Sequence, residues 1–348
     1  LSLHDALPIY LLFGGNVAIG AQYRHENYSI REGEPAATFG VGADGFAGFA
    51  PRIPVDQGRD AYAVYADLEL QPIPELFLGG AVRYDDYDDF GGKTTWRGTA
   101  RIDLIDGFAL RGTIGTGFKA PSLYQLYSDY GNTSLQPEES TSYDLGLAYG
   151  TRTARTYASV TLFQRDSENL IGFIGCPVQT GICTNRPYGT YDNVDVARAR
   201  GVEVEAGVTP FEGLSLRAAY AYTEAEDRSP GSANFGNELA RRPQHAGTVS
   251  LDWAPKPDTL FVPVVGGDVR VVGKAFDDAA NLVPLDGYTI VDLRVSVPLG
   301  SILGERPVEV FGRVENLFDE TYYPSAHGNN NIQPAEPFSA RIGVRFAL

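Results

Sequence analysis

The fold is decided by stretches such as residues 289–297, which read Thr-Ile-Val-Asp-Leu-Arg-Val-Ser-Val. From position 291 the odd-numbered residues are Val or Leu, and between them lie Asp292, Arg294 and Ser296. Successive side chains of a β-strand point to opposite faces, so this alternation predicts a strand with one apolar and one polar face. Residues 143–149 repeat the pattern with Tyr and Leu at the apolar positions.

Alternation with a period of two covers most of the chain. Roughly fourteen segments of about ten residues show it, and no convincing long run at helical spacing interrupts them. The apolar runs also fall short of the roughly 18 to 20 residues that a membrane helix requires. We therefore predict an all-β fold with strands near residues 16–30, 59–71, 76–88, 93–105, 108–119, 139–150, 154–168, 192–209, 214–226, 243–254, 261–276, 287–299, 307–318 and 338–348.

The connections between these strands alternate in length. Short turns are expected at residues 71–75, 105–107 and 150–153, whereas residues 119–138 and 169–191 form long connectors. Short turns at one end and long loops at the other are typical of an antiparallel up-and-down sheet. Soluble sandwiches and propellers have no reason to segregate loop length in this way.

The two faces of the predicted sheet decide between a soluble and a membrane barrel. A small soluble barrel fills its interior with apolar side chains, but this many strands would enclose a lumen too wide to pack. Charged side chains suit a wet lumen, and the apolar face then meets lipid. A bilayer also demands closure of the sheet. The sequence thus predicts a transmembrane β-barrel, with lumen-facing arginines at Arg97, Arg101, Arg217, Arg294 and Arg313.

Charge and motifs exclude several classes of function. The chain of 348 residues carries 28 basic and 44 acidic residues, a formal net charge of −16. A nucleic-acid-binding protein needs a basic surface to neutralise phosphates, so no nucleic-acid partner is expected. No GxSxG, no phosphate-binding glycine loop between a strand and a helix, and no HExxH is present, and no enzyme is predicted.

Several segments resemble the C-terminal barrel of TonB-dependent outer-membrane receptors. Residues 117–123 (Gly-Phe-Lys-Ala-Pro-Ser-Leu) and 132–138 (Asn-Thr-Ser-Leu-Gln-Pro-Glu) are similar to the paired FRAP and NPNL-type boxes of that family. Residues 199–205, 241–245 and 314–322 match further boxes. Each box is weak by itself, and the resemblance rests on their order and spacing.

The resemblance implies a barrel of about 22 strands, preceded by a plug and a motif that engages a TonB-type energy-transducing complex. About fourteen strands are predicted here. We therefore expect a partial barrel over residues 10–348 that lacks the plug, after a non-native or unstructured leader at residues 1–9.

The same resemblance implies a function in the bacterial outer membrane. The expected activity is energy-coupled uptake of a metal chelate such as a ferric siderophore or cobalamin, with no cofactor of its own. The lumen arginines would pair with plug carboxylates. The alternative is a passive porin-like channel, which a plug-encoding region upstream of Tyr10 would argue against.

Ligand capture in such receptors falls to the outer loops and the plug. Aromatic rings pack against flat ligands, and arginine neutralises an anionic chelate. The alternative is that these residues only pack loops or line the membrane interface. The substrate-binding candidates are Tyr124, Tyr127, Tyr130, Arg186, Tyr188 and Tyr191.

The long connector at residues 169–191 contains the two cysteines of the chain, Cys176 and Cys183. An extracellular loop lies in an oxidising compartment, which permits a disulfide between them. Free thiols are the alternative. A metal pair is disfavoured because no further Cys or His lies nearby.

Four aspartates lie in one predicted outer turn: Asp85, Asp86, Asp88 and Asp89. Clustered carboxylates can hold calcium, although their spacing does not match an EF-hand loop. The alternative is a solvated acidic turn. Calcium is therefore a weak candidate here.

Overall fold

A computed structural model describes most of the chain. The described residues are 5–11, 14–31, 55–176, 178–184, 186, 189–255, 260–301, 307–326 and 332–346. They fall into two compact units, the first with residues 1–100, 113–142 and 166–197 and the second with residues 101–112, 143–165 and 198–348. Among the described residues no helix is both long and apolar enough to cross a membrane.

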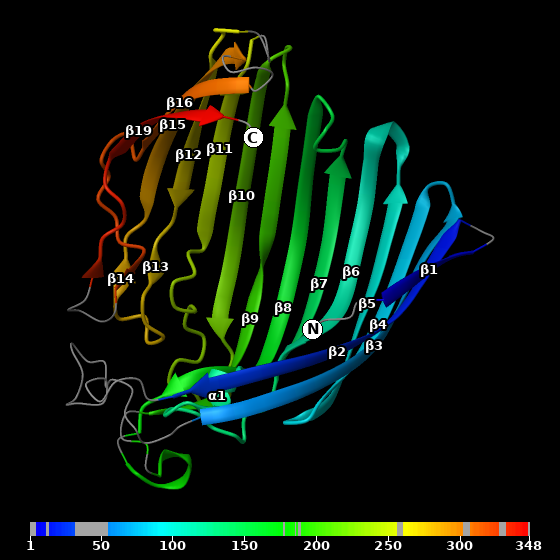
Figure 1. Cartoon of the computed structure of the whole chain (residues 1–348), viewed down its shortest axis with the longest axis vertical. Helices are drawn as coiled ribbons and strands as arrows, with labels where there is room; N and C mark the ends of the chain where they lie inside the picture. The colour runs from blue at the N-terminus through cyan, green and yellow to red at the C-terminus, as the bar shows by residue number, and fades with distance from the viewer. Residues whose placement is uncertain are drawn as a thin grey trace. The chain divides into compact units, whose positions relative to one another are not determined.

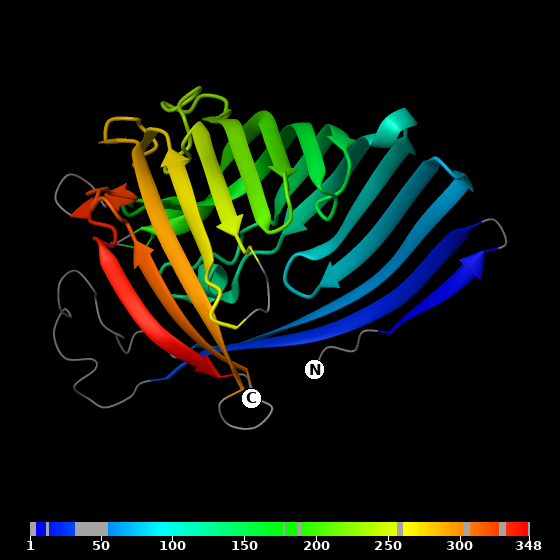
Figure 2. The ribbon, with the colours of Figure 1, turned by 90° about the horizontal axis from the view of Figure 1, so that it is seen from above.

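Among the described residues, one antiparallel sheet of fifteen strands contains nearly all the secondary structure. Its strands pair in chain order, which Figures 1 and 2 show as a colour sequence from blue to red. Its members are β1 (Asp5–Leu11), β2 (Gly15–Ile30), β3 (Val55–Ile73), β4 (Leu76–Tyr87), β5 (Gly91–Asp103), β6 (Phe108–Lys119), β7 (Glu138–Tyr149), β8 (Thr156–Ile174), β9 (Thr190–Val208), β10 (Leu214–Asp227), β11 (His245–Trp253), β12 (Val264–Val272), β15 (Tyr288–Ser301), β16 (Pro307–Glu315) and β19 (Ser339–Phe346).

All fourteen predicted strands are present, so the predicted all-β fold class is confirmed. The predicted strand at 261–276 is shorter than expected, because β12 ends at Val272. Ala275–Phe276 instead forms β13, which pairs with β14 (Pro284–Leu285) in a small hairpin within the next connector.

Strand β1 differs from the expectation for the start of the chain. Residues 5–9 were expected to lie in a leader outside the fold, but the structure pairs Asp5–Leu11 with β2 in an antiparallel register. The turn between the two strands includes Gly14, whose φ of 67° is one that glycine adopts without steric cost. The described part of the expected leader therefore belongs to the sheet.

The long connectors carry the remaining elements. Helix α1 (Leu123–Tyr127) lies between β6 and β7, and the 3-10 turn η3 (Gly181–Cys183) lies between β8 and β9. A second 3-10 turn, η2 (Ile105–Gly107), joins β5 to β6. Two short strands, β17 (Ser325–Ala326) and β18 (Ile332–Gln333), pair with each other before β19.

The apolar face of the sheet is exposed rather than packed in a protein core. In β11, Val249, Leu251 and Trp253 retain 46%, 44% and 43% of their accessible surface. Between them Ser250 donates to Asp268 and Asp252 pairs with arginines, which marks the polar face. Broad apolar exposure on one face is expected of strands whose solvent is lipid.

Candidate functional site

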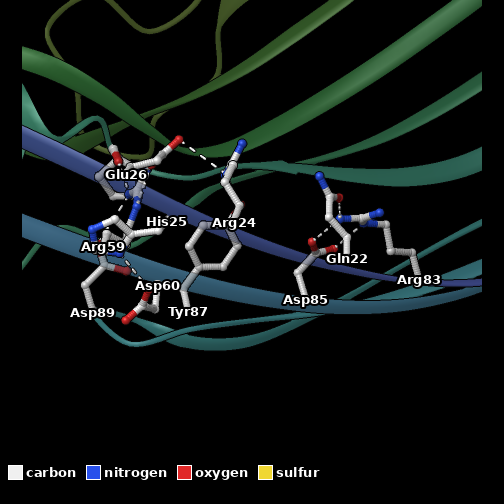
Figure 3. Close-up of polar contacts among 11 residues, drawn as sticks. Gln22, Arg24, His25, Glu26, Arg59, Asp60, Arg83, Asp85, Tyr87 and Asp89 are labelled. Atoms are coloured by element: carbon white, nitrogen blue, oxygen red, sulfur yellow. Dashed lines mark hydrogen bonds and ion pairs between the residues drawn. The ribbon is translucent and has the colours of Figure 1, made fainter. Parts of the chain in front are cut away.

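A polar network on β2, β3 and β4 surrounds Arg59, which is only 5% exposed (Figure 3). Arg59 lies directly opposite Glu26 in the β2–β3 register, and its Nε donates to Glu26 Oε2 at 3.0 Å. Its Nη1 donates to Asp89 Oδ2 at 3.3 Å and to the carbonyl oxygen of Pro121 at 2.7 Å. The Tyr87 ring lies 5.3 Å from the guanidinium carbon. The guanidinium is therefore enclosed by acceptors and one aromatic face.

The network continues along the same face of the sheet. Arg24 donates to the Tyr87 hydroxyl at 2.8 Å. Arg83 forms a two-pronged pair with Asp85 at 2.8 and 2.7 Å and also donates to Gln22. Alternation along each strand directs these polar side chains to one face. These hydrogen bonds and ion pairs hold the polar side chains of the first unit in place next to the β6–β7 connector.

Asp89 is the least satisfied member of the network. It lies in the turn between β4 and β5, and its Oδ1 is buried without a hydrogen-bond partner. Burial raises the pKa of the Asp89 carboxyl, although Arg59 opposes this shift. Burial and the nearby Asp89 charge also raise the pKa of the Tyr127 hydroxyl. The charge state of the Asp89 carboxyl therefore depends on the neighbouring Arg59 guanidinium.

Helix α1 begins where Arg59 holds Pro121. Ser122 caps the helix by accepting from the backbone N–H of Gln125 at 3.1 Å, while the Gln125 side chain accepts from the N–H of Ser122 at 2.9 Å. Leu123, Leu126 and Leu135 are 9%, 5% and 2% exposed and pack together. The connector thus has a miniature core of its own, against which Tyr28, Tyr127, Ile171 and Tyr191 pack.

Five aromatic rings lie next to this core, and we call them the aromatic platform: Tyr28, Tyr124, Tyr191, Phe173 and Tyr130. Successive centroids are 6.4, 6.3, 5.4 and 5.7 Å apart, with edge-to-face geometry throughout. Tyr124 is 43% exposed and Phe173 is 51% exposed. The platform therefore presents aromatic surface that edge-to-face contacts hold in place.

Asparagine side chains join the connector to β9. Asn132 donates to the carbonyl oxygen of Tyr191 at 2.9 Å. Asn193 accepts from the N–H of Gln136 at 2.7 Å and donates to the carbonyl oxygens of Gln136 and Asn169, each at 2.8 Å. These bonds satisfy backbone groups of loop segments that no strand ladder would satisfy. They fix the spacing between α1 and Tyr191.

The structure brings together three of the six predicted substrate-binding residues, because Tyr124, Tyr130 and Tyr191 belong to the platform. Tyr127 packs against the miniature core. Arg186 lies nearby and donates to the carbonyl oxygen of Asp129 at 3.0 Å. Tyr188 lies outside the described residues.

Sequence reasoning missed Tyr28, Phe173 and Arg59 at this site. Tyr28 lies near the end of a predicted strand and has the sequence context of an ordinary strand aromatic. Phe173 lies in the predicted connector at residues 169–191, into which β8 extends as far as Ile174. In the sequence, Arg59 resembles the other arginines of the predicted polar face, and nothing marks it as buried. Only the pairing of distant segments reveals that these three residues surround the β6–β7 connector.

The structure joins Cys176 and Cys183 in a disulfide, with 1.98 Å between the sulfur atoms. The ring that it closes contains η3. Gln179, inside that ring, donates to the carbonyl oxygen of Cys176 at 2.8 Å and accepts from the N–H of Arg186 at 2.9 Å. The crosslinked turn is therefore tied to the segment that leads to Tyr191.

The four aspartates proposed as a weak calcium site are not gathered around one point. Asp85 pairs with Arg83, and Asp89 pairs with Arg59. Asp86 alternates with Asp85 on β4, so it belongs to the other face. Among the described residues no group of three or more His, Cys, Asp or Glu side chains is arranged to hold a metal ion. A calcium site at this turn stays a prediction from the sequence.

The five predicted lumen arginines all have carboxylate partners in the barrel wall. In the second unit Arg294 pairs with both Asp252 and Asp268, and Arg217 shares Asp252. The remaining pairs are Arg97 with Asp67 at 3.7 Å, Arg101 with Asp103 at 2.7 Å and Arg313 with Glu315 at 3.0 Å. Pairing of these arginines with a plug stays a prediction.

Comparison with known proteins identifies the family. Residues 4–317 match the family model described as TonB dependent receptor-like, beta-barrel. The chain belongs to the TonB-dependent receptor family. It is 32% identical over 267 residues to the vitamin B12 transporter BtuB of Photobacterium profundum, a match that covers 76% of this chain and 40% of that protein. The chain thus spans less than half of that relative.

Solved structures of receptors share the fold. The ferric enterobactin receptor PfeA of Pseudomonas aeruginosa matches with a TM-score of 0.73 at 20% identity, over 99% of this chain and 53% of that one. The ferric preacinetobactin receptor BauA of Acinetobacter baumannii matches with a TM-score of 0.69 at 14% identity, over the same shares. At these identities the likeness shows the fold alone.

Membership of the TonB-dependent receptor family places this barrel in the outer membrane of Gram-negative bacteria. The exposed apolar face of the sheet is the lipid-facing side of such a barrel. The relatives are transporters and receptors, so the expectation that the chain is not an enzyme is confirmed.

Proposed function

We propose that the TonB-dependent receptor containing this chain imports a metal chelate of the cobalamin or ferric siderophore class. The observation that carries the proposal is the 32% identity to a vitamin B12 transporter over 267 residues. Cobalamin is therefore the first ligand to test, and a ferric catecholate is the second. The energy-transducing partner would be a TonB-type complex that acts through a plug.

The aromatic platform supports ligand capture by the outer loops. Its rings are arranged before binding, so little side-chain ordering remains to oppose association. Tyr124 and Phe173 expose aromatic surface, and Arg186 lies in the neighbouring segment. Aromatic side chains beside a few polar groups are typical of small-molecule binding sites. We assign the first ligand contacts to Tyr124, Tyr130, Phe173 and Tyr191.

The test is uptake by cells that carry the complete receptor. Radiolabelled cyanocobalamin and radiolabelled ferric enterobactin are supplied separately to isogenic hosts with and without TonB. We expect one probe to accumulate only in the host that has TonB. Equal entry of both probes in the two hosts would support the passive channel instead, and failure of both probes to bind would reject the proposed ligand class.

A further inference from the structure

We propose that Arg59 is a positioning residue, which fixes the start of helix α1 and thereby holds Tyr124 in the aromatic platform. This inference rests on the proposed function for its ligand readout, although its structural readout is independent of any ligand. Arg59 itself does not belong to the platform. It acts through the backbone of Pro121.

The guanidinium of Arg59 joins three segments that are far apart in the chain. Its acceptors are Glu26 on β2, Asp89 in the β4–β5 turn and the carbonyl oxygen of Pro121 in the β6–β7 connector. A planar fork with five N–H donors can bond in these separate directions at once. A lysine ammonium would keep the charge but place its donors around one point. The geometry therefore depends on the fork as well as on the charge.

Pro121 is the point at which this network reaches the helix. Proline has no backbone N–H, so its carbonyl oxygen is the only backbone group through which the residue can be hydrogen-bonded. Pro121 is almost fully buried, and Arg59 satisfies that oxygen at 2.7 Å. Ser122 follows as the helix cap, and Tyr124 lies two residues further on. Fixing Pro121 thus fixes the direction in which α1 starts.

Removal of Arg59 would leave the connector without its anchor. The Asp89 side chain is 12% exposed and would lose its ion-pair partner, whereas Glu26 is 31% exposed and keeps an ion pair with Arg24 at 3.4 Å. Unpaired buried charge is strongly unfavourable and is relieved when water enters. The lowest-energy response is release of the segment at Pro121, because the strands beneath it keep their own ladder hydrogen bonds. Release of this segment displaces Tyr124.

The experiment compares Arg59→Lys and Arg59→Met with Arg152→Lys and Arg152→Met in the complete receptor. Arg152 is the matched control, because it also pairs with a carboxylate, that of Glu205, but its side chain is 79% exposed and it lies in the turn between β7 and β8. Hydrogen–deuterium exchange is measured for the peptide spanning residues 122–135 and for β10 to β12. Dissociation constants for cyanocobalamin and ferric enterobactin, and uptake rates at saturating probe, are measured in parallel.

We expect both Arg59 variants to exchange at least about tenfold faster over residues 122–135, with β10 to β12 unchanged and both Arg152 variants like wild type. The dissociation constant of the bound probe rises about tenfold, while uptake at saturation stays near the wild-type rate. Wild-type exchange in Arg59→Lys would overturn the positioning role of the fork. Faster exchange throughout the sheet would overturn it too, because Arg59 would then only support the barrel.

The two proposals fail separately in this design. If neither probe binds the wild-type receptor, the proposed ligand class is rejected. The exchange data still decide whether Arg59 holds residues 122–135, since that measurement uses no ligand.

Discussion

Two arginines on the polar face, Arg59 in the first unit and Arg294 in the second, have similar partners but different surroundings. Each contacts two carboxylates, Glu26 and Asp89 for Arg59 and Asp252 and Asp268 for Arg294. The Arg59 side chain is 6% exposed, whereas the Arg294 side chain is 40% exposed. Burial, rather than the number of ion pairs, distinguishes the two sites.

The segments that each arginine joins also differ. Arg294 on β15 reaches β12 and β11, which the sheet ladder already connects to it in sequence. Arg59 reaches the carbonyl oxygen of Pro121, 62 residues away, in a connector that no ladder holds. An ion pair between strands that are already paired adds little constraint. A guanidinium hydrogen bond that fixes a loop backbone sets where the loop's side chains lie.

The largest expected effect comes from removing one carboxylate at each site. Glu26→Ala leaves Arg59 with fewer acceptors in a buried place, and we expect a loss of about 2–3 kcal/mol in the free energy of unfolding. Asp268→Ala leaves Arg294 paired with Asp252 in contact with water, and we expect a loss of less than about 1 kcal/mol. Urea unfolding of the receptor in detergent measures both. Equal losses of unfolding free energy in the two variants would contradict the difference that we infer from the burial of the two arginines.

A smaller effect is expected from high salt, which should weaken the ion pairs of Arg294 more than those of Arg59. At about 1 M salt the screening length falls to about 3 Å, so exposed charge pairs weaken more than buried ones. A double-mutant cycle on Arg294 and Asp268 should lose most of its coupling energy at high salt. The cycle on Arg59 and Glu26 should keep the larger part of its coupling. A greater salt sensitivity for the Arg59 pair would contradict its burial.

The smallest expected effect is a pH dependence that Asp89 imposes. Burial raises the pKa of this carboxyl in the folded protein, so the folded state binds its proton more tightly than the unfolded state does. Stability of the turn therefore increases as the pH falls through the raised pKa and levels off below the ordinary aspartate value. Hydrogen exchange of residues 86–92 at descending pH, corrected for intrinsic rates, measures this. Asp89→Asn should flatten the dependence, and an unchanged slope in that variant would assign it to another group.

The sheet is predictable from sequence because its signal is local. Alternation over residues 289–297 predicts a strand, and the structure has β15 at Tyr288–Ser301. The charged positions of the alternation also identify the polar face, on which Arg294 meets Asp252. Strand ends are less certain, as the split between β12 and β13 shows, because turn geometry decides where a ladder stops.

The candidate site is only half predictable, because its contacts are not local. Tyr124, Tyr130 and Tyr191 could be proposed from their place in long connectors. Tyr28 joins them only through strand pairing, and Phe173 joins them because β8 extends into the predicted connector. The burial of Arg59 depends on a connector 62 residues away, so nothing beside it in the sequence marks it. The four predicted outer-turn aspartates are held apart by contacts of two kinds, because Asp85 pairs with Arg83 two residues away on the same strand, whereas Asp89 pairs with Arg59 of β3.

Ligand capture by the aromatic platform is tested most directly by equilibrium binding. Cyanocobalamin and ferric enterobactin are each titrated into the complete receptor that carries either Tyr124→Ala or Tyr143→Ala. The two tyrosines are 43% and 44% exposed, but Tyr124 belongs to the platform and Tyr143 to the apolar face of β7. We predict that Tyr124→Ala weakens binding of the recognised probe about tenfold and that Tyr143→Ala leaves it unchanged. Equal affinities for the two variants would contradict ligand capture by the aromatic platform.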